Sequence, residues 1–480
     1  MKNTTWTDEL SYAAGSLSDA TRNLVSPRLR LGITGLSRAG KTVCITALTH
    51  ALLNAAPLPL FEPARAGRIR RCWLQPQPDR NIPRFAYEEH LAALTAGEER
   101  RWPESTRRIS ELRLMLEYEP QGFFSRTLSG GRLALDIVDY PGEWLLDLPL
   151  LDMDFITFSD VALHAAEVPH RKELAAPWLK ALREVDVAAP FEEPVAAKLA
   201  GAYRAYLAAC RAERGHYAAL RPGRFLMPGD LEGSPALTFC PLPRPESLPG
   251  AGSLWREMEK RYQAYVHHVV RPFFFDHFAR LDAQLVLVDV LSAINAGPAA
   301  LADLRETLHT VMASFRLGRP HLFARRVHRI VFAATRADLL PSAQHERLRR
   351  ILALLVEEAA KRAKYAGVEI DTLVLAAIRA TREGTVAHEG EELPVVIGVP
   401  ETGETLNGKV FDGVEETALY PGELPEDPRA VLKEDLTDSL RFLHFRPPRV
   451  EPPMPLEPAP PFPHIRLDAT LQFLLADALA

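Results

Sequence analysis

The sequence is poor in cysteine and has no long apolar segment. Its 480 residues include only four cysteines, at positions 44, 72, 210 and 240, and none forms a Cys-x-x-Cys pair. This spacing argues against a disulfide framework and against a cysteine zinc site. No apolar run of about 18 residues occurs, and the first residues lack the basic and then apolar pattern of a signal peptide. We therefore expect a cytoplasmic protein without a transmembrane segment; this composition remains compatible with peripheral membrane contact.

The sequence also lacks a large excess of charge of either sign. It has 57 lysines and arginines against 62 aspartates and glutamates, so the formal net charge is -5. Apart from a local basic patch at Arg65–Arg71, this balance gives no sign of a nucleic-acid-binding surface, and we expect no nucleic-acid partner. Hydrophobic residues make up 47% of the chain, which is enough for a large core. The length predicts about two to three domains, or one domain with large insertions.

One motif organises the rest of the sequence. Residues 35–42 read Gly-Leu-Ser-Arg-Ala-Gly-Lys-Thr and fit the phosphate-loop pattern G-x-x-x-x-G-K-[ST]. Apolar residues alternate before this motif, as in a strand, and recur at helical spacing after it. Where a strand is followed by a glycine-rich loop and a helix, the backbone N–H groups of the loop converge on a phosphate at the helix N-terminus. This context disfavours the alternative of a strand-to-helix turn with a chance Gly-Lys-Thr.

The side chains of this loop have separate predicted roles. Lys41 should reach the β- and γ-phosphates and take part in catalysis, and the hydroxyl of Thr42 should ligate Mg²⁺. Arg38 is either a stabilising cation or a solvated side chain. The residues predicted to bind the nucleotide here are Gly35, Ser37, Arg38, Ala39, Gly40, Lys41, Thr42 and Val43.

A second motif follows a predicted hairpin of two strands, Ile109–Tyr118 and Arg132–Asp139. The hairpin ends in Asp-Tyr-Pro-Gly at 139–142, which fits the D-x-x-G pattern of a nucleotide switch. The carboxylate of Asp139 should hold the Mg²⁺ shell. The N–H of Gly142 should bond the γ-phosphate, because a glycine has no side chain to block the approach.

A third motif follows the buried strand Arg329–Ala334, at the sheet edge where ligands of open α/β sheets bind. Thr335-Arg336-Ala337-Asp338 resembles the [NT]-K-x-D guanine-recognition signature of GTPases. The carboxylate of Asp338 can accept from the N1–H and the exocyclic amine of guanine, an arrangement that adenine cannot satisfy. Arg336 replaces the usual lysine and can cover the same face of the base.

The next strand, predicted over Val368–Ala377, ends in a fourth motif. Ala376-Ala377-Ile378 resembles the S-A-x element, whose backbone N–H contacts the guanine O6. The backbones of Ala377 and Ile378 are therefore added to the predicted nucleotide-binding set.

The order of these motifs is similar to that of the GTPase superclass of P-loop proteins. The strings WPEST, DYPGEW, LVLVDVLSAINAG, TRAD, AIRAT and HIRLD closely resemble the YcjX-like family of bacterial P-loop GTPases, from the phosphate loop nearly to the C-terminus. This resemblance implies Mg²⁺-dependent binding of GTP, its hydrolysis to GDP, and an association with bacterial stress responses.

Further roles follow from motif position in that superclass. Thr106 takes the place of the switch threonine that meets Mg²⁺, with Thr95 as the alternative. Glu143 takes the place of the water-positioning glutamine, although a salt bridge or a surface contact is an equally good interpretation. Arg107 and Arg108 either supply a stabilising cation or are solvated. Without a secure catalytic residue, we expect slow hydrolysis.

The predicted fold is an α/β P-loop NTPase, a GTPase-type G domain with a large, mainly helical insertion and a mixed C-terminal extension. The expected divisions are an N-terminal helical segment at 1–28, G domain at 29–150 and 281–385, the helical insertion at 151–280, and the extension, with a proline-rich connector and a final helix, at 386–480. Helices are expected at Asp8–Val25, Tyr87–Thr95, Val195–Glu213, Ser253–Val270, Ala299–Phe315 and Ile465–Leu479, with another between Ser342 as its cap and Gly367, and strands at Gln284–Leu291 and Val395–Val399.

The leading functional hypothesis is a GTP-hydrolysing switch that signals to an unknown protein partner through the helical insertion. A nucleotide-binding scaffold with little turnover is the second hypothesis, and Glu143 at the usual glutamine position favours it. An ATP-dependent small-molecule kinase is the third, but a kinase would not need the motif at 335–338.

Overall fold

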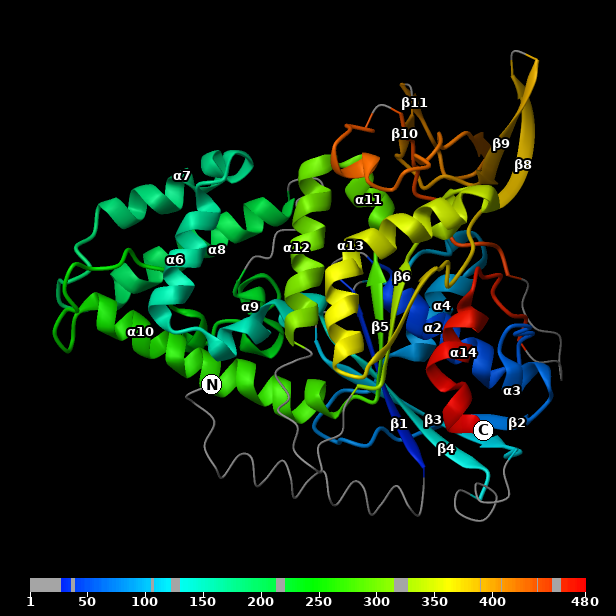
Figure 1. Cartoon of the computed structure of the whole chain (residues 1–480), viewed down its shortest axis with the longest axis horizontal. Helices are drawn as coiled ribbons and strands as arrows, with labels where there is room; N and C mark the ends of the chain where they lie inside the picture. Colours follow the sequence, from blue (N-terminus) through cyan, green and yellow to red (C-terminus); the bar gives the residue numbers. More distant parts are fainter. Residues whose placement is uncertain are drawn as a thin grey trace.

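The centre of the molecule is a seven-stranded sheet with the strand order β2-β3-β4-β1-β5-β6-β7 (Figure 1). Neighbouring strands from β4 to β7 run parallel, whereas β3 pairs antiparallel with β4 and with β2. The strands are β1 (Arg28–Gly35), β2 (Ile69–Gln75), β3 (Ser110–Tyr118), β4 (Arg132–Asp139), β5 (Ala283–Val288), β6 (Arg329–Ala334) and β7 (Glu369–Val374).

The computed structural model describes residues 27–35, 39–104, 108–121, 130–212, 221–314, 327–388, 390–406, 408–437, 439–450 and 459–480. The helix predicted at Asp8–Val25 lies outside these residues. Among the helices that are described, none combines the length and the apolar character needed to span a membrane.

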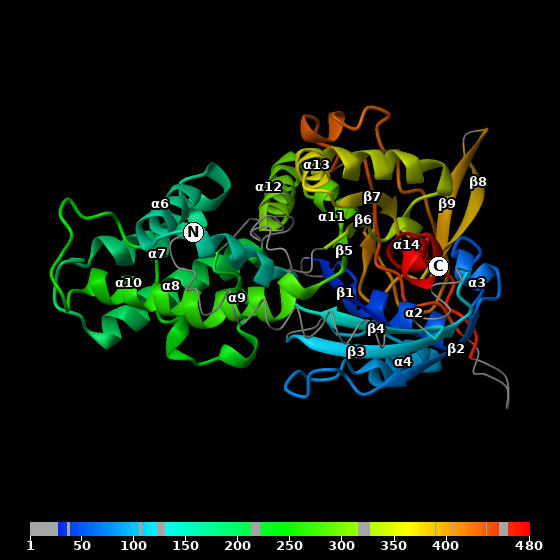
Figure 2. The same ribbon diagram turned by 60° about the horizontal axis from the view of Figure 1, so that its bottom comes forward.

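Helices cover both faces of the sheet, which is why most residues of its central strands are buried (Figure 2). Successive side chains of a strand point to opposite faces, so Leu285 and Leu287 of β5 join the core on one face, and Val286 and Val288 join the core on the other. The first face carries α2 (Lys41–Leu53), α3 (Glu62–Arg65), α4 (Tyr87–Thr95) and α14 (Leu467–Leu475), and the second carries α11 (Val290–Asn295), α12 (Pro298–Ser314) and α13 (His345–Tyr365).

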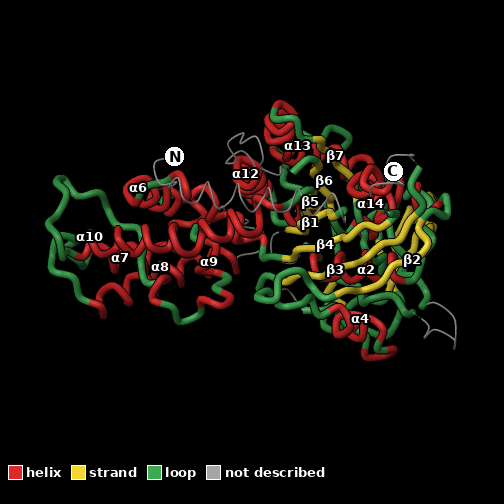
Figure 3. The backbone as a smooth tube through the Cα atoms, turned by 90° about the horizontal axis from the view of Figure 1, so that it is seen from below, coloured by secondary structure: helices red, strands yellow, loops and turns green. Residues whose placement is uncertain are grey.

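A group of helices between β4 and β5 lies beside the sheet, at the left of Figures 1 and 3. Its core is rich in aromatic rings: Trp178 stacks on Tyr206 with 5.3 Å between ring centroids, and Phe158 stacks on Tyr262 at 4.8 Å. The members are α6 (Phe155–Ala166), α7 (Pro169–Arg183), α8 (Glu193–Ala212), α9 (Gly223–Leu226) and α10 (Leu254–Tyr265), followed by π-helical turns at Val266–Val270 and Phe273–His277.

The part of the chain after β7 carries its own small sheets and then returns to the main sheet. Backbone hydrogen bonds join Ala376 and Ile465 in both directions, and Arg379 N donates to Pro463 O at 2.7 Å. The chain after 459 thereby props the loop that follows β7. The small strands are β8 (Arg382–His388), β9 (Glu391–Gly398), β10 (Thr405–Leu406), β11 (Lys409–Val410) and β12 (Thr417–Leu419).

Several predicted elements are confirmed, among them α4 and β6 with the predicted bounds. Two predictions were wrong, and one strand was missed. The missed strand is β2, in the interval 55–101, where only the helix Tyr87–Thr95 was predicted. The strand expected over Gln284–Leu291 ends at Val288, because Asp289 caps α11 by accepting from Ser292 N. Ser342 does not cap α13, since its hydroxyl donates to Glu383 and the helix begins at His345.

Candidate functional site

The phosphate-loop motif joins the end of β1 to the start of α2. Gly35 is the last residue of the strand, and a Cβ there would lie 2.7 Å from the carbonyl oxygen of Leu287, so only glycine fits. Gly40 precedes the helix with a φ of 85°, in the left-handed region that glycine adopts without strain. The N-terminus of α2 therefore faces the carboxyl edge of the sheet, as an anion site requires.

Two side chains at the start of α2 donate hydrogen bonds to backbone carbonyl oxygens. The ammonium of Lys41 is buried and donates to Gly35 O at 2.8 Å. The hydroxyl of Thr42 donates to Glu104 O at 3.3 Å, which brings the segment ahead of β3 against the loop. Four predicted residues of this region, Ser37, Arg38, Thr106 and Arg107, lie outside the described residues.

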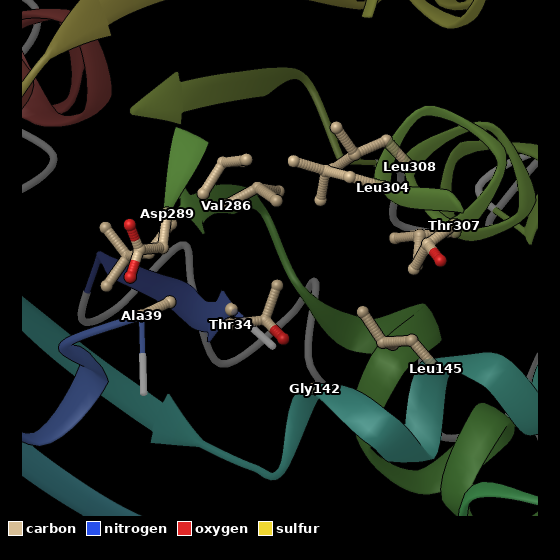
Figure 4. A pocket seen from close by; sticks show the side chains of 13 residues that line it. Thr34, Ala39, Gly142, Leu145, Val286, Asp289, Leu304, Thr307 and Leu308 are labelled. Atoms are coloured by element: carbon tan, nitrogen blue, oxygen red, sulfur yellow. The ribbon is translucent and has the colours of Figure 1, made fainter. Parts of the chain in front are cut away.

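Asp139 and Gly142 lie just beyond the end of β4, on the strand next to β1. Asp139 closes β4 opposite Ile33 of β1 and is almost completely buried. Gly142 begins a 3-10 helix, Gly142–Asp152, and shares a small cavity of about 20 Å³ with Gly35. Figure 4 shows this cavity; its far wall is formed by α12.

The donor atoms at this edge suit a hard cation. Thr42 offers a hydroxyl and Asp139 a carboxylate, and oxygen is the ligand that Mg²⁺ prefers. The described residues contain no group of three or more His, Cys, Asp and Glu side chains that could hold a metal by themselves. The residues therefore fit a Mg²⁺ that takes most of its shell from water and phosphate, which is the usual arrangement for that ion.

The motif at 335–338 follows β6 and turns sharply toward the sheet edge. Arg336 has a φ of 58°, a left-handed conformation that non-glycine residues adopt at few positions, often in functional sites. Its guanidinium lies 3.4 Å from the carboxylate of Asp289. Asp338 accepts from Ala380 N at 2.8 Å, and burial raises the pKa of its carboxyl. The motif is thus held between β5 and the loop after β7.

The phosphate loop, the motif at 335–338 and the segment 376–378 meet in one cavity of about 530 Å³, within the size range of ligand pockets. Asp139, Gly142 and Glu143 are not part of its lining. The residues that line it from the predicted set are Ala39, Gly40, Lys41, Thr42, Val43, Thr335, Arg336, Asp338, Ala377 and Ile378.

The side chain of Glu143 is directed to the helical group rather than to this cavity. One carboxylate oxygen lies 3.2 Å from Nη2 of Arg211, near the end of α8. A Cβ on Gly223 would lie 1.9 Å from the carbonyl oxygen of Glu143, so the two backbones touch. Glu143 therefore forms a salt bridge, which was predicted from the sequence as the alternative to a water-positioning role.

Other residues of the 3-10 helix are bound to the same helical group. Trp144 Nε1 donates to Met227 O at 2.9 Å. Asp147 accepts from Gly223 N and from the hydroxyl of Tyr265, both at 2.6 Å. Burial raises the pKa of Asp147 to about 6, and these hydrogen bonds oppose that rise. The start of the 3-10 helix lies beside the phosphate loop, and the rest of it is part of the helical core.

The cavity also has a wall that motif reasoning missed. The residues of this wall lie outside the phosphate-loop motif and the motifs at 335–338 and 376–378 in the sequence. The only sequence signal that pointed to any of them was the WPEST string, which contains Trp102. The missed lining residues are Trp102, Pro103, Glu401, Glu404, Leu443, His444 and Phe445. The HIRLD string has a structural role, since Ile465 pairs with Ala376 at the edge of the cavity.

The fold and the site define a mixed α/β protein with a mostly parallel sheet and a ligand-sized cavity at the carboxyl ends of its strands. The chain belongs to the YcjX-like family, DUF463, which matches residues 29–479. It is 37% identical over 471 residues to the "Ras-like GTPase YcjX" of Escherichia coli, covering 95% of this chain and 97% of that protein. A protein of the same name from Shewanella oneidensis is 36% identical over 479 residues, with 94% of each chain covered.

Proposed function

We propose that the protein is a GTPase that binds GTP with Mg²⁺ and hydrolyses it slowly to GDP. One observation carries the proposal: the phosphate-loop residues and the guanine-type motif line the same cavity of about 530 Å³. A nucleotide placed there has its phosphates at the N-terminus of α2 and its base at Asp338. The names of the two relatives support the same activity.

The proposed roles of the residues follow from their positions. Lys41 exchanges its hydrogen bond to Gly35 for the phosphates, and the N–H of Gly142 meets the γ-phosphate. Asp338 accepts from the guanine edge while the N–H groups of Ala377 and Ile378 face O6. Thr42, Asp139 and Thr106 would hold Mg²⁺, which neutralises charge on the phosphates when it is bound.

We further propose that the protein acts as a switch and that the helices within 151–280 form an insertion that reads the nucleotide state. A shift of Gly142 toward a γ-phosphate would pull on the 3-10 helix, whose Trp144 and Asp147 are fixed to the helical group. After hydrolysis Gly142 and Thr106 would be released. The unknown protein partner would then meet a different helical surface. We also propose that residues 386–480 form a C-terminal extension of the G domain, that the protein is cytoplasmic, and that it acts in bacterial stress responses.

A second function, a scaffold with little turnover, is favoured by the ion pair between Glu143 and Arg211. While that pair persists, Glu143 cannot orient a water molecule at the γ-phosphate. A kinase that uses ATP is the weaker choice, because adenine lacks the N1–H and the 2-amine from which Asp338 would accept.

Competition between GTP and ATP for the purified protein tests the guanine assignment. We expect GTP to displace a bound guanine nucleotide, whereas ATP should not; equal competition would overturn the assignment. Lys41→Ala should abolish hydrolysis, with Lys198→Ala as the matched control, because Lys198 is exposed on α8. Single-turnover hydrolysis with and without cell extract separates the two functions: stimulated turnover supports a switch, and negligible turnover in both supports a scaffold.

A further inference from the structure

One wall of the cavity comes from two segments near residues 399–404 and 443–446, which pair with each other. Glu401 N donates to His444 O at 2.8 Å, and Arg446 N donates to Val399 O at 2.8 Å. An isolated antiparallel bridge between Pro400 and Phe445 lies between these two bonds. The wall is therefore a fixed two-stranded ribbon and not a loose loop.

This ribbon spans the cavity from one side to the other. On one side Trp102 Nε1 donates to Phe445 O at 2.7 Å. On the other side the Nη1 atom of Arg336 lies 3.4 Å from Nε2 of His444. The ribbon thus closes the gap between the segment ahead of β3 and the base motif.

The imidazole of His444 is held in one orientation by a single carboxylate. Nδ1 of His444 lies 3.0 Å from Oε1 of Glu404, and the backbone N–H of His444 donates to Oε2 at 3.1 Å. A carboxylate beside Nδ1 favours the tautomer with the proton on that nitrogen. Nε2 is then the acceptor, which also suits its place next to the Arg336 guanidinium.

The carboxylate of Glu401 is the second acceptor of the wall. It lines the cavity and is half-buried, and no donor among the described residues bonds to it. Burial raises the pKa of this carboxyl, because removal from water disfavours its charged form. A ligand that brings hydrogen-bond donors would offset that cost.

The two ends of a nucleotide are already assigned, to Lys41 for the phosphates and to Asp338 for the base. The part between them is the ribose, whose 2′- and 3′-hydroxyls are hydrogen-bond donors. We propose that Glu401 and the Nε2 atom of His444 accept from these hydroxyls, with Nε2 exchanging its 3.4 Å contact with Arg336 for the ligand, so that the site selects ribonucleotides over deoxyribonucleotides. Glu404 is a positioning residue for His444. This inference rests on the proposed function, since it assumes a guanine nucleotide in the cavity.

Calorimetric titration with GDP, 2′-deoxy-GDP and 2′,3′-dideoxy-GDP tests the proposal. Unlabelled nucleotides are needed, because common fluorescent labels occupy the ribose hydroxyls. A hydrogen bond to a charged acceptor predicts a loss of about 10-fold or more for the first hydroxyl and a further loss for the second. Glu401→Gln and His444→Ala should each bring the three affinities closer together. Glu391→Gln, at an exposed position on β9, is the matched control and should leave the ratios unchanged.

Each result decides the proposal. Equal affinity of the unmodified protein for GDP and its deoxy forms overturns it, and so does discrimination that survives in both Glu401→Gln and His444→Ala. The ratio between nucleotides is the readout, so a general loss of affinity from disturbed packing does not mimic the expected result. Failure to bind any guanine nucleotide would overturn the proposed function itself, and the inference with it.

Discussion

Arg211 and Glu143 form an ion pair across the boundary between the sheet and the helical group, with 3.2 Å between Nη2 and Oε1. Glu143 is buried, whereas the arginine side chain is about one-third exposed. Glu143 directly follows Gly142 in the sequence. If a γ-phosphate moves Gly142, as we propose, the movement should stretch the ion pair or carry α8 with it.

Removal of Arg211 should have two measurable effects. Arg211→Ala leaves a buried carboxylate without its partner, and after allowance for solvent screening we expect a loss of about 1–2 kcal/mol in the free energy of unfolding. If the pair restrains Glu143, hydrolysis of GTP should also become faster. Denaturant unfolding and single-turnover kinetics measure the two effects. Lys198→Ala on the same helix is the control; a rate unchanged from the parent would show that the pair does not restrain catalysis.

Contact between Gly223 and the Glu143 carbonyl predicts a severe effect of one methyl group. Gly223→Ala would place Cβ 1.9 Å from that oxygen, so the 3-10 helix and α9 must separate. We expect a loss of about 2 kcal/mol or more in the free energy of unfolding. Gly201→Ala in α8 is the matched control: a Cβ there meets no atom within 4 Å, and its helical position predicts a gain of up to about 1 kcal/mol. Similar stabilities of the two variants would contradict the described contact.

The buried carboxyl of Asp147 predicts a pH dependence of stability with a definite sign. Its pKa is raised from 3.8 to about 6, so the folded protein binds this proton more tightly than the unfolded chain. Its contribution to stability is therefore fully present below pH 4 and declines until about pH 6, by roughly 3 kcal/mol in all. The difference in unfolding free energy between the parent and Asp147→Asn should fall by this amount from pH 4 to pH 7.

Tyr265 provides a check on the same group. Its hydroxyl donates to Asp147 and lowers the pKa that burial raises. In Tyr265→Phe the decline should extend to higher pH. A decline at the same pH in Tyr265→Phe would assign the titration to another carboxyl.

The proposed recognition of guanine by Asp338 predicts discrimination against inosine. Inosine nucleotides lack the exocyclic amine, so one hydrogen bond to the carboxylate is lost and affinity should fall by about 10- to 100-fold relative to the guanine nucleotide. Competition binding measures the ratio. In Asp338→Ala the two nucleotides should bind with similar, weaker affinity; a ratio that stays large in this variant would place the amine against another group.

Much of the main sheet was predictable because its central strands contain runs of buried apolar residues, and several of them end in recognisable motifs. β6 is one example, a buried run that leads directly into Thr335. β2 was not predictable: Arg70 and Arg71 are exposed neighbours in its sequence, and a register shift between Ile69 and Arg71 breaks the alternation that marks a strand. Only pairing with β3 defines it.

Part of the candidate site was also predictable from the sequence, and part was not. Motif spacing placed Lys41 and Asp338 in one cavity because strand ends meet at one edge of a parallel sheet. No local pattern indicates that His444 lies near Arg336, or that Arg211 pairs with Glu143. Both contacts are made by segments remote in sequence, and their positions depend on how the helical group and the small sheets pack.

Pairing of Ile465 with Ala376 has a consequence for the order in which the protein is made. The ribosome synthesises the loop after β7 well before the segment around Ile465 that pairs with it. A nascent chain therefore carries its phosphate loop early but lacks the complete proposed base pocket until residues 459–465 have emerged. Binding of the proposed nucleotide would then stabilise the completed fold by mass action and not the partly synthesised chain.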